Sequence, residues 1–202
     1  MVDYSIENEY REKGFNVICG VDEAGRGPLA GPVYAAAVIL PSDCVIEGLN
    51  DSKKLTEKKR EALFDEIKEK ALAYGIASAD EKEIDEINIL NATFIAMKRA
   101  IDSLSVKPDL ALIDGNQKPH TDIEEVTVIK GDAKSMSIAA ASVLAKVSRD
   151  RFMLEMAEKY PQYEFARHKG YGTKLHYEKI AQYGVCDIHR RTFLKKILGE
   201  QK

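Results

Sequence analysis

Four carboxylates, Asp22, Glu23, Asp114 and Asp132, stand at or just beyond segments that are typical of buried strands. Like charges that converge on one point repel one another and raise each other's pKa, so a fold gains little by gathering them unless it binds a cation there. Oxygen ligands alone favour Mg²⁺ or Mn²⁺ over zinc. Two such ions, about 3.5–4 Å apart, activate water and stabilise the leaving oxygen of a phosphodiester. The four acids therefore indicate metal-dependent hydrolysis.

Each carboxylate also has a purely structural interpretation. Asp114 is followed by glycine, and Asp-Gly is a common turn pair. Asp132 precedes a helical pattern and can cap its N-terminus. Asp22 and Glu23 are neighbours, and neighbours in a regular strand face opposite sides, so both reach one metal centre only if the backbone leaves strand geometry there. From the residues alone, these alternatives stay open.

The segment after the first two acids is rich in glycine and proline. It reads Ala24-Gly25-Arg26-Gly27-Pro28-Leu29-Ala30-Gly31-Pro32. Its glycines let backbone approach a ligand closely, and Arg26 can meet a phosphate. A lone Gly-x-Gly is too weak to indicate a nucleotide-binding loop. Metal ligands, close backbone and an arginine together favour chemistry on a nucleic acid.

The elements that must position these residues alternate between strands and helices, which predicts an α/β fold. Strands are expected over 17–22, 33–40, 76–79, 110–113 and 125–130. Helices are expected over 56–73, 84–104, 135–160, 173–183 and 192–198, with Thr56 as N-cap and Gly75 as stop signal of the first. Asp22, Asp114 and Asp132 then lie at strand ends, where open α/β sheets collect their sites.

Composition favours a single domain in a reducing, cytoplasmic setting. The 202 residues are 45% apolar and 31% charged, with a formal net charge of −3. The longest apolar runs, 33–40 and 138–145, fall short of the ~20 residues that span a bilayer. The polar N-terminus does not resemble a secretory signal. Three scattered cysteines, Cys19, Cys44 and Cys186, favour free thiols over disulfides or a zinc site.

Charge is distributed unevenly along the chain. Residues 167–202 hold nine Lys or Arg and three Asp or Glu, a net charge of +6, which leaves −9 on the other 166 residues. A basic C-terminal segment can track phosphates while an acidic body holds cations. The simpler interpretation is a solvated helical surface.

Several motifs, met in order, resemble those of bacterial ribonuclease HII. They are Asp22 to Pro32, Asp51-Ser52-Lys53-Lys54-Leu55, 84–90, Leu112-Ile113-Asp114-Gly115, Gly131-Asp132-Ala133-Lys134-Ser135, 138–147, His168-Lys169-Gly170-Tyr171-Gly172-Thr173 and 188–191. The resemblance implies a ribonuclease H-like fold, with a mixed five-stranded sheet flanked by helices. It implies one catalytic domain over 1–202, with a core over about 15–165 and a basic helical substrate-binding extension over about 166–202.

The same resemblance implies an endoribonuclease that hydrolyses the RNA strand of RNA–DNA hybrids and nicks duplex DNA 5′ to single embedded ribonucleotides. The four carboxylates would bind two divalent ions, Mg²⁺ or Mn²⁺. A metal-activated water would be the nucleophile, without a covalent enzyme intermediate, and the products would be 3′-hydroxyl and 5′-phosphate ends. A monomer is expected, with hybrid and ribonucleotide-containing duplexes as partners and no membrane.

Family likeness also implies how the substrate is read. A Gly-Arg-Gly triplet, here Gly25, Arg26 and Gly27, reads the ribonucleotide 2′-hydroxyl largely through backbone. Only that hydroxyl separates RNA from DNA at one position. The tyrosine of a Gly-Tyr-Gly motif, here Tyr171, packs on the sugar of the following deoxynucleotide, where a 2′-hydroxyl would clash. The pair would thus select an RNA-to-DNA junction.

Further candidates for substrate contact have competing interpretations. They are Lys53, Lys54, Lys134, Ser135, Lys146, Arg149, Lys169 and Arg190. A solvated surface position is the alternative for Lys146 and Arg149, and helix capping for Ser135. His168 and His189 lie in matched motifs and are expected to make structural hydrogen bonds.

Other function classes fit less well. Ribonuclease HIII, the sister type, lacks the Gly-Arg-Gly pattern. A non-catalytic hybrid-binding protein would have lost at least one of the four carboxylates. A phosphatase or nucleotide-binding protein would carry a phosphate loop, and no Gly-x4-Gly-Lys-Ser/Thr sequence occurs. The chain departs from many relatives at Cys186-Asp187, where they carry Ser-Pro.

Overall fold

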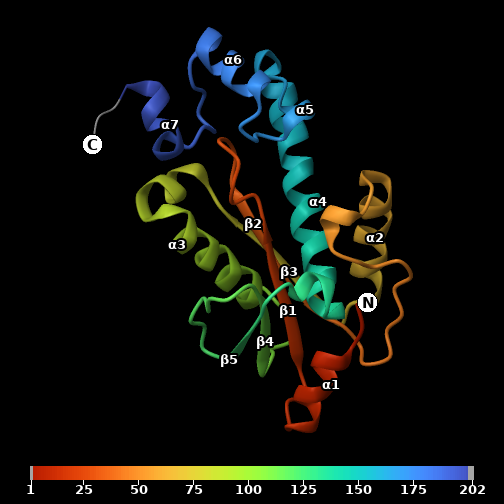
Figure 1. Ribbon diagram of the computed structural model, residues 1–202. Helices are drawn as coiled ribbons and strands as arrows, with labels where there is room; N and C mark the ends of the chain where they lie inside the picture. Colours follow the sequence, from red (N-terminus) through yellow and green to blue (C-terminus); the bar gives the residue numbers. More distant parts are fainter. Residues whose placement is uncertain (1, 200–202) are drawn as a thin grey trace.

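A five-stranded sheet forms the centre of the computed structural model, which describes residues 2–199 (Figure 1). Its strands are β1 (Ile18–Ala24), β2 (Val33–Ile39), β3 (Ala73–Ala79), β4 (Leu110–Asp114) and β5 (Glu124–Val128). They lie in the order β3-β2-β1-β4-β5. Strands β1, β2 and β3 pair antiparallel, whereas β1, β4 and β5 pair parallel, so the sheet is mixed as predicted.

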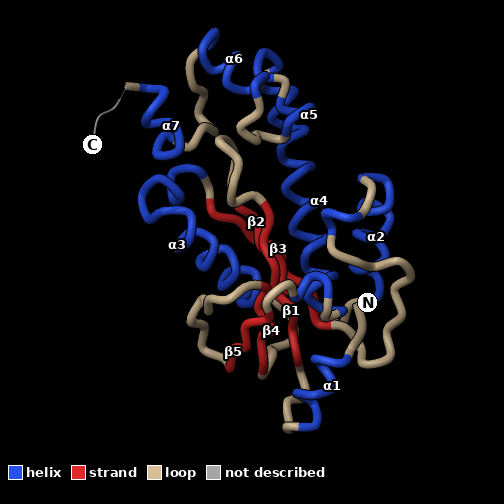
Figure 2. The backbone as a smooth tube through the Cα atoms, in the orientation of Figure 1, coloured by secondary structure: helices blue, strands red, loops and turns tan. Residues whose placement is uncertain are grey.

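Helices cover both faces of the sheet (Figure 2). Helix α3 (Glu81–Asp102) packs on one face, and α1 (Ser5–Glu12), α2 (Glu57–Lys70) and α4 (Met136–Lys159) pack on the other. Alternate residues of β2 serve the two sides: Ala36 and Val38 face α2 and α4, while Ala35 and Ala37 face α3. This double burial explains the continuous apolar run in β2.

Small residues set the distance between helices and sheet. A Cβ at Gly20 would lie 2.2 Å from the backbone nitrogen of Ile138, and one at Gly75 would lie 2.0 Å from the carbonyl oxygen of Ala100. Glycine is therefore required where α4 crosses β1 and where α3 crosses β3. Gly75 is not the stop signal that we expected for α2, because it lies inside β3, which begins three residues earlier than predicted.

Three short helices, α5 (Phe165–His168), α6 (Lys174–Tyr183) and α7 (Arg191–Leu198), lie beyond one end of the sheet, at the top of Figure 1. Asp85 of α3 accepts hydrogen bonds from the backbone nitrogens of Arg191 and Thr192, and so caps the N-terminus of α7.

Glu200 and Lys202, which were counted in the basic segment, lie outside the described residues. In residues 2–199 no helix is long and apolar enough to cross a membrane, and all three cysteines are free.

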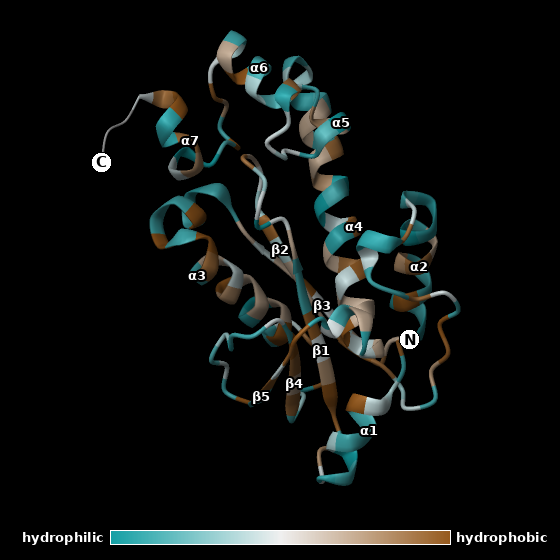
Figure 3. Cartoon of the chain, viewed as in Figure 1, coloured by the Kyte–Doolittle hydropathy of each residue, from teal (hydrophilic) through white to brown (hydrophobic). Residues whose placement is uncertain are grey.

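Two predicted strand ends were misplaced, and both carry acids. Strand β1 does not stop at Asp22 but continues to Ala24, with Asp22 opposite Ala36. Strand β5 ends at Val128, Lys130 takes a left-handed conformation (φ 57°), and Asp132 lies in the 3-10 turn η2 (Gly131–Ala133). In Figure 3, β1 is brown over most of its length and teal near its C-terminal end. The acidic site therefore lies at the end of an apolar strand.

Candidate active site

Three of the predicted carboxylates meet at one edge of the sheet. Asp22, Asp114 and Asp132 each bring an oxygen to within 4.8 Å of the other two, and we call them the three-carboxylate group. Because β1 and β4 are parallel neighbours with Val21 opposite Ile113, their C-terminal ends deliver Asp22 and Asp114 to the same place. Asp22 is 3% exposed and Asp132 5% exposed, so these two acids are removed from bulk solvent, whereas Asp114 is half-buried.

A tight turn brings the third acid to the other two. The backbone nitrogens of Gly131 and Asp132 lie 2.6 Å and 3.4 Å from Oδ1 of Asp114, so this carboxylate anchors η2. A Cβ at Gly131 would lie 2.5 Å from Cδ1 of Ile138 and 3.2 Å from the same carboxylate oxygen. Glycine thus allows the close approach that places Asp132 beside Asp114.

Burial makes ionisation of Asp22 and Asp114 unfavourable. It raises the pKa of Asp22 well above its ordinary value, and the neighbouring charges of Glu23 and Asp114 raise it further. Burial also raises the pKa of Asp114, with the charge of Asp132 adding to the effect. Nζ of Lys53 lies 3.3 Å from Oδ2 of Asp132, but its side chain is 76% exposed. Buried oxygen-only donors with so little compensating charge suit a hard divalent cation.

Glu23 lies outside the three-carboxylate group. Strand geometry persists through Ala24, so the departure from it that would bring both acids to one centre does not occur at this point, and adjacent Asp22 and Glu23 face opposite sides. Nη1 of Arg26 lies 3.4 Å from Oε1 of Glu23. Burial raises the pKa of Glu23, and Arg26 opposes that rise. Both acids nevertheless line one hollow of about 240 Å³.

That hollow also brings the predicted substrate residues to the acids. Its lining includes Gly25, Arg26, Lys53 and Tyr171. Residues 25–27, the Gly-Arg-Gly loop, start with Gly25 in a positive φ of 97°, and a Cβ there would lie 2.1 Å from Nε of Arg149. Tyr171 is 43% exposed. Gly25 and Tyr171, separated by more than 140 positions, thus line the same hollow as the candidate metal ligands.

Two arginines that we considered for phosphate contact are buried instead. Arg190 donates to the carbonyl oxygens of Gly25 (2.6 Å), Arg26 (2.9 Å) and Gly31 (2.8 Å), so its guanidinium shapes the Gly-Arg-Gly loop from inside. Arg149 donates to the carbonyl oxygens of Ala30 and Lys169. Neither fully buried side chain can reach a phosphate, and neither is the solvated surface residue that was the alternative for Arg149.

The Arg149 guanidinium also lies over the ring of Tyr171. Its Cζ is 5.6 Å from the centre of the tyrosine ring. Its Nε and Nη1 have no hydrogen-bond partner among residues 2–199, and burial lowers its pKa. The sequence carried a signal for this burial, because Arg149 continues the three- and four-residue spacing of Ile138, Ala141 and Ala145 along α4.

The remaining candidates divide into buried and exposed side chains. Ser135 is fully buried, donates to Oε1 of Glu7 (2.7 Å) and accepts from the backbone nitrogen of Ile138, so its role is capping α4 and not substrate contact. Lys54 and Lys134 are exposed. Lys169 is half-buried, and its Nζ donates to the carbonyl oxygen of Ala166. Lys146 pairs with Asp150 at 2.7 Å.

Comparison with known proteins finds similar sequences that belong to one family. The family model described as Ribonuclease HII matches residues 19–196. A ribonuclease HII of Caldicellulosiruptor bescii is 57% identical over 97% of this chain and 95% of its own. One of Acetivibrio thermocellus is 60% identical over 95% of this chain and 75% of its own.

A solved structure shares the fold as well. The crystal structure of the ribonuclease H2 from Pyrococcus horikoshii OT3 aligns with a TM-score of 0.74 and 28% identity, covering 92% of this chain and all of that one. The predicted ribonuclease H-like fold is thereby confirmed. Because the sequence match extends over nearly the whole chain and the fold agrees, this chain belongs to the ribonuclease HII family.

Proposed function

We propose that this chain hydrolyses the RNA strand of RNA–DNA hybrids and nicks duplex DNA 5′ to a single embedded ribonucleotide, leaving 3′-hydroxyl and 5′-phosphate ends. As a member of its family the chain is a ribonuclease, a hydrolase of phosphodiester bonds. The observation that carries the finer proposal is the shared hollow, in which acids at the sheet edge border the Gly-Arg-Gly loop and Tyr171.

We assign two divalent ions, Mg²⁺ or Mn²⁺, to Asp22, Glu23, Asp114 and Asp132. When bound, such ions activate water and stabilise the leaving oxygen of the phosphodiester. The three-carboxylate group offers hard oxygen donors, and burial raises the pKa of Asp22 and Asp114 among them, which supports this assignment. Glu23 borders the same hollow from the other side of β1 and would complete the ligand set.

The protein's own part in the reaction is to orient the substrate. The Gly-Arg-Gly loop would read the 2′-hydroxyl, a group that both donates and accepts hydrogen bonds. Arg190 holds two carbonyl groups of that loop, which keeps its backbone preorganised. Tyr171 would pack on the next sugar and exclude a second 2′-hydroxyl. Lys53, Lys134 and Lys169 would meet phosphates.

We further propose that residues 166–202 are a substrate-binding extension of a core over about 15–165. The extension supplies Tyr171 to the hollow and Arg190 to the Gly-Arg-Gly loop. These contacts support its assignment to the same catalytic domain rather than to a separate one.

A DNA duplex with one ribonucleotide in one strand tests the proposal. We expect a single nick 5′ to the ribonucleotide in Mg²⁺ or Mn²⁺, none in EDTA, and none in an all-DNA duplex. Cleavage of long hybrids alone would remove the junction role of Arg26 and Tyr171. Tight hybrid binding without any cleavage would instead favour a non-catalytic binder.

A further inference from the structure

Three buried histidines in the C-terminal segment take no part in the chemistry proposed above. His168, His176 and His189 pack among the rings of Tyr163 and Phe165, and the rings of His168 and His176 stack with their centres 4.3 Å apart. A buried polar ring is costly unless its nitrogens are hydrogen-bonded, so their partners define what they do.

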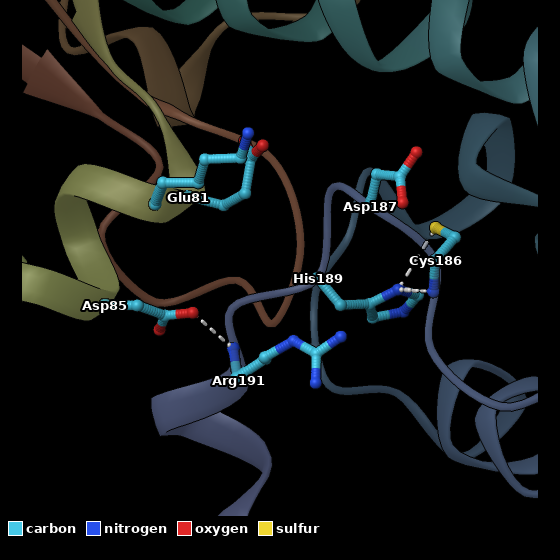
Figure 4. Close-up of a pocket in the computed structure, with 7 residues that line it drawn as sticks. Glu81, Asp85, Cys186, Asp187, His189 and Arg191 are labelled. Atoms are coloured by element: carbon cyan, nitrogen blue, oxygen red, sulfur yellow. Dashed lines mark hydrogen bonds between the residues drawn. The ribbon is translucent and has the colours of Figure 1, made fainter.

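The partners of two histidines allow one neutral arrangement of protons. Nδ1 of His176 lies 3.0 Å from the carbonyl oxygen of Tyr171 and must donate, because a carbonyl only accepts. Nδ1 of His189 accepts from the backbone nitrogen of Cys186 at 2.9 Å, a contact visible in Figure 4. His189 therefore carries its proton on Nε2 and donates it to the bare Nε2 of His176, 3.1 Å away.

We call this chain from Cys186 through His189 and His176 to Tyr171 the histidine relay. Burial lowers the pKa of both relay histidines to about 4, in keeping with neutral rings. His168 supports the same loop, because its Nδ1 accepts from the backbone nitrogen of Gly170 at 3.2 Å. Histidines thus bond the backbone on both sides of the Tyr171 side chain.

The relay also leads to the Gly-Arg-Gly loop. The backbone nitrogen of Leu29 donates to the carbonyl oxygen of Gly170, and that of Gly31 donates to the carbonyl oxygen of Ile188, both at 2.8 Å. Arg190, which follows His189 directly, holds the carbonyl groups of the loop. The segment that carries His189 therefore also anchors the Gly-Arg-Gly loop, which lines the same hollow as Tyr171.

We propose that His176, with its tautomer set by His189, is a positioning residue that fixes Tyr171 against the Gly-Arg-Gly loop and so sets the preference for RNA-to-DNA junctions. This inference rests on the proposed function, in which Tyr171 packs on the deoxyribose beyond the ribonucleotide. The hydrogen bond from Nδ1 of His176 carries the effect. The hydrogen bond between His189 and His176 only keeps the His176 ring oriented with Nδ1 toward the Tyr171 carbonyl.

A matched pair of variants isolates that hydrogen bond. An asparagine amide nitrogen takes about the place of Nδ1, so His176→Asn keeps the donor to Tyr171 and loses the contact with His189. His176→Gln reaches toward Nε2 and loses the donor. Each variant sacrifices one of the two bonds, so general damage to packing is similar in both. The readout is the ratio of kcat/KM for the single-ribonucleotide duplex to kcat/KM for a uniform RNA–DNA hybrid.

We expect His176→Gln to lower this ratio about tenfold, the effect of one lost hydrogen bond, mainly through KM on the junction substrate. His176→Asn should stay near the wild-type ratio. Equal ratios in all three proteins would overturn the inference and leave the proposed function intact, as would an equal loss on both substrates in the glutamine variant. A wild-type protein that ignores the junction substrate would overturn both.

A measurement on the unmodified protein does not depend on how the variants fold. Nitrogen-15 NMR of the histidine rings distinguishes a protonated Nδ1 from a protonated Nε2. We expect a proton on Nδ1 of His176 and on Nε2 of His189 at neutral pH. The opposite tautomer of His176 would remove its hydrogen bond to the Tyr171 carbonyl oxygen, which would then accept only from the backbone nitrogen of Thr173, and would overturn the inference.

Discussion

The three-carboxylate group and the histidine relay are both buried sets of titratable side chains, but they handle charge in opposite ways. The acids gather with like neighbours, and burial raises the pKa of Asp22 and Asp114. The histidines donate to and accept from one another and the backbone, and burial lowers their pKa values.

This difference indicates which of the two sets, the three-carboxylate group (the carboxylate half) or the histidine relay (the histidine half), gains from a ligand. The carboxylate half is electrostatically unfavourable when metal-free, so it gains from a cation. The histidine half has its hydrogen bonds satisfied within the protein, so it is complete before substrate arrives. The three-carboxylate group is thus suited to binding a cation, and the histidine relay is suited to keeping the backbone around Tyr171 in place.

The largest effect should come from the carboxylate half. Asp22→Asn should lower turnover on the single-ribonucleotide duplex on the order of 10³-fold, because a metal ligand contributes several kcal/mol to the transition state. In EDTA the same variant should melt about 2–4 °C higher than wild type at pH 7 if about 1 kcal/mol of repulsion is relieved. Exposed Asp65 offers the control, and Asp65→Asn should change neither quantity. Full activity in Asp22→Asn would remove Asp22 from the metal site.

Arg190→Lys tests the support of the Gly-Arg-Gly loop. Lysine cannot reproduce a guanidinium that serves three carbonyl groups, so the loop should shift and kcat/KM should fall on the order of 10²-fold on ribonucleotide substrates. Its neighbour Arg191 has an exposed side chain, and Arg191→Lys should behave like wild type. Unchanged kinetics in Arg190→Lys would mean that the loop is held without its guanidinium.

Tyr171→Ala should produce a smaller and more selective loss. Removing the ring should slow cleavage at a single embedded ribonucleotide about tenfold, the worth of one aromatic contact, with less effect on a uniform hybrid. Tyr171→Phe should retain the wild-type rate, because the ring face makes the contact. Parallel rate measurements on the two substrates decide this, and an equal loss on both would show that the junction role is wrong.

The smallest expected effects are in the pH dependence of stability, where the two halves have opposite signs. Asp22 and Asp114 have raised pKa values in the folded state. Their contribution to the free energy of unfolding is therefore present below pH 3.8, the ordinary pKa of aspartate, and is lost as pH rises. The melting temperature gap between Asp22→Asn and wild type in EDTA should therefore widen with pH. Saturating Mg²⁺ should close it.

The histidines act in the other direction. Their pKa values of about 4 lie below the ordinary 6.5, so the folded state resists protonation and wild type loses stability as pH falls from 6.5 toward 4. His176→Phe should lose fewer degrees over this window. Glu81, Asp187 and Arg191 line the cavity beside His189, so the comparison is made within one variant pair, in which these neighbours are the same. Identical slopes would show that the relay does not titrate in this range.

Local sequence determined much of this protein. The spacing of apolar residues and the turn and capping residues between them predicted most of the strands and the long helix α4. The apolar stretch before Asp114 predicted β4 with its acid at the end. The order of motifs indicated the ribonuclease HII family, which the comparisons confirm. These features depend on residues close together in the chain, so they can be read without knowing what packs against them.

Tertiary structure decided the rest, because the deciding partners are far apart in sequence. Ser135 is not available to substrate because its hydroxyl is buried and donates a hydrogen bond to Glu7. Glu7 belongs to α1, a helix that we did not predict. Gly75 lies in a strand paired with β2, at a point where α3 packs too closely for any side chain. Arg190 serves Gly25 from 165 positions away. Residue types alone showed which groups could carry charge, and only the packing determined which of them line the hollow and which are buried and hold the loops in place.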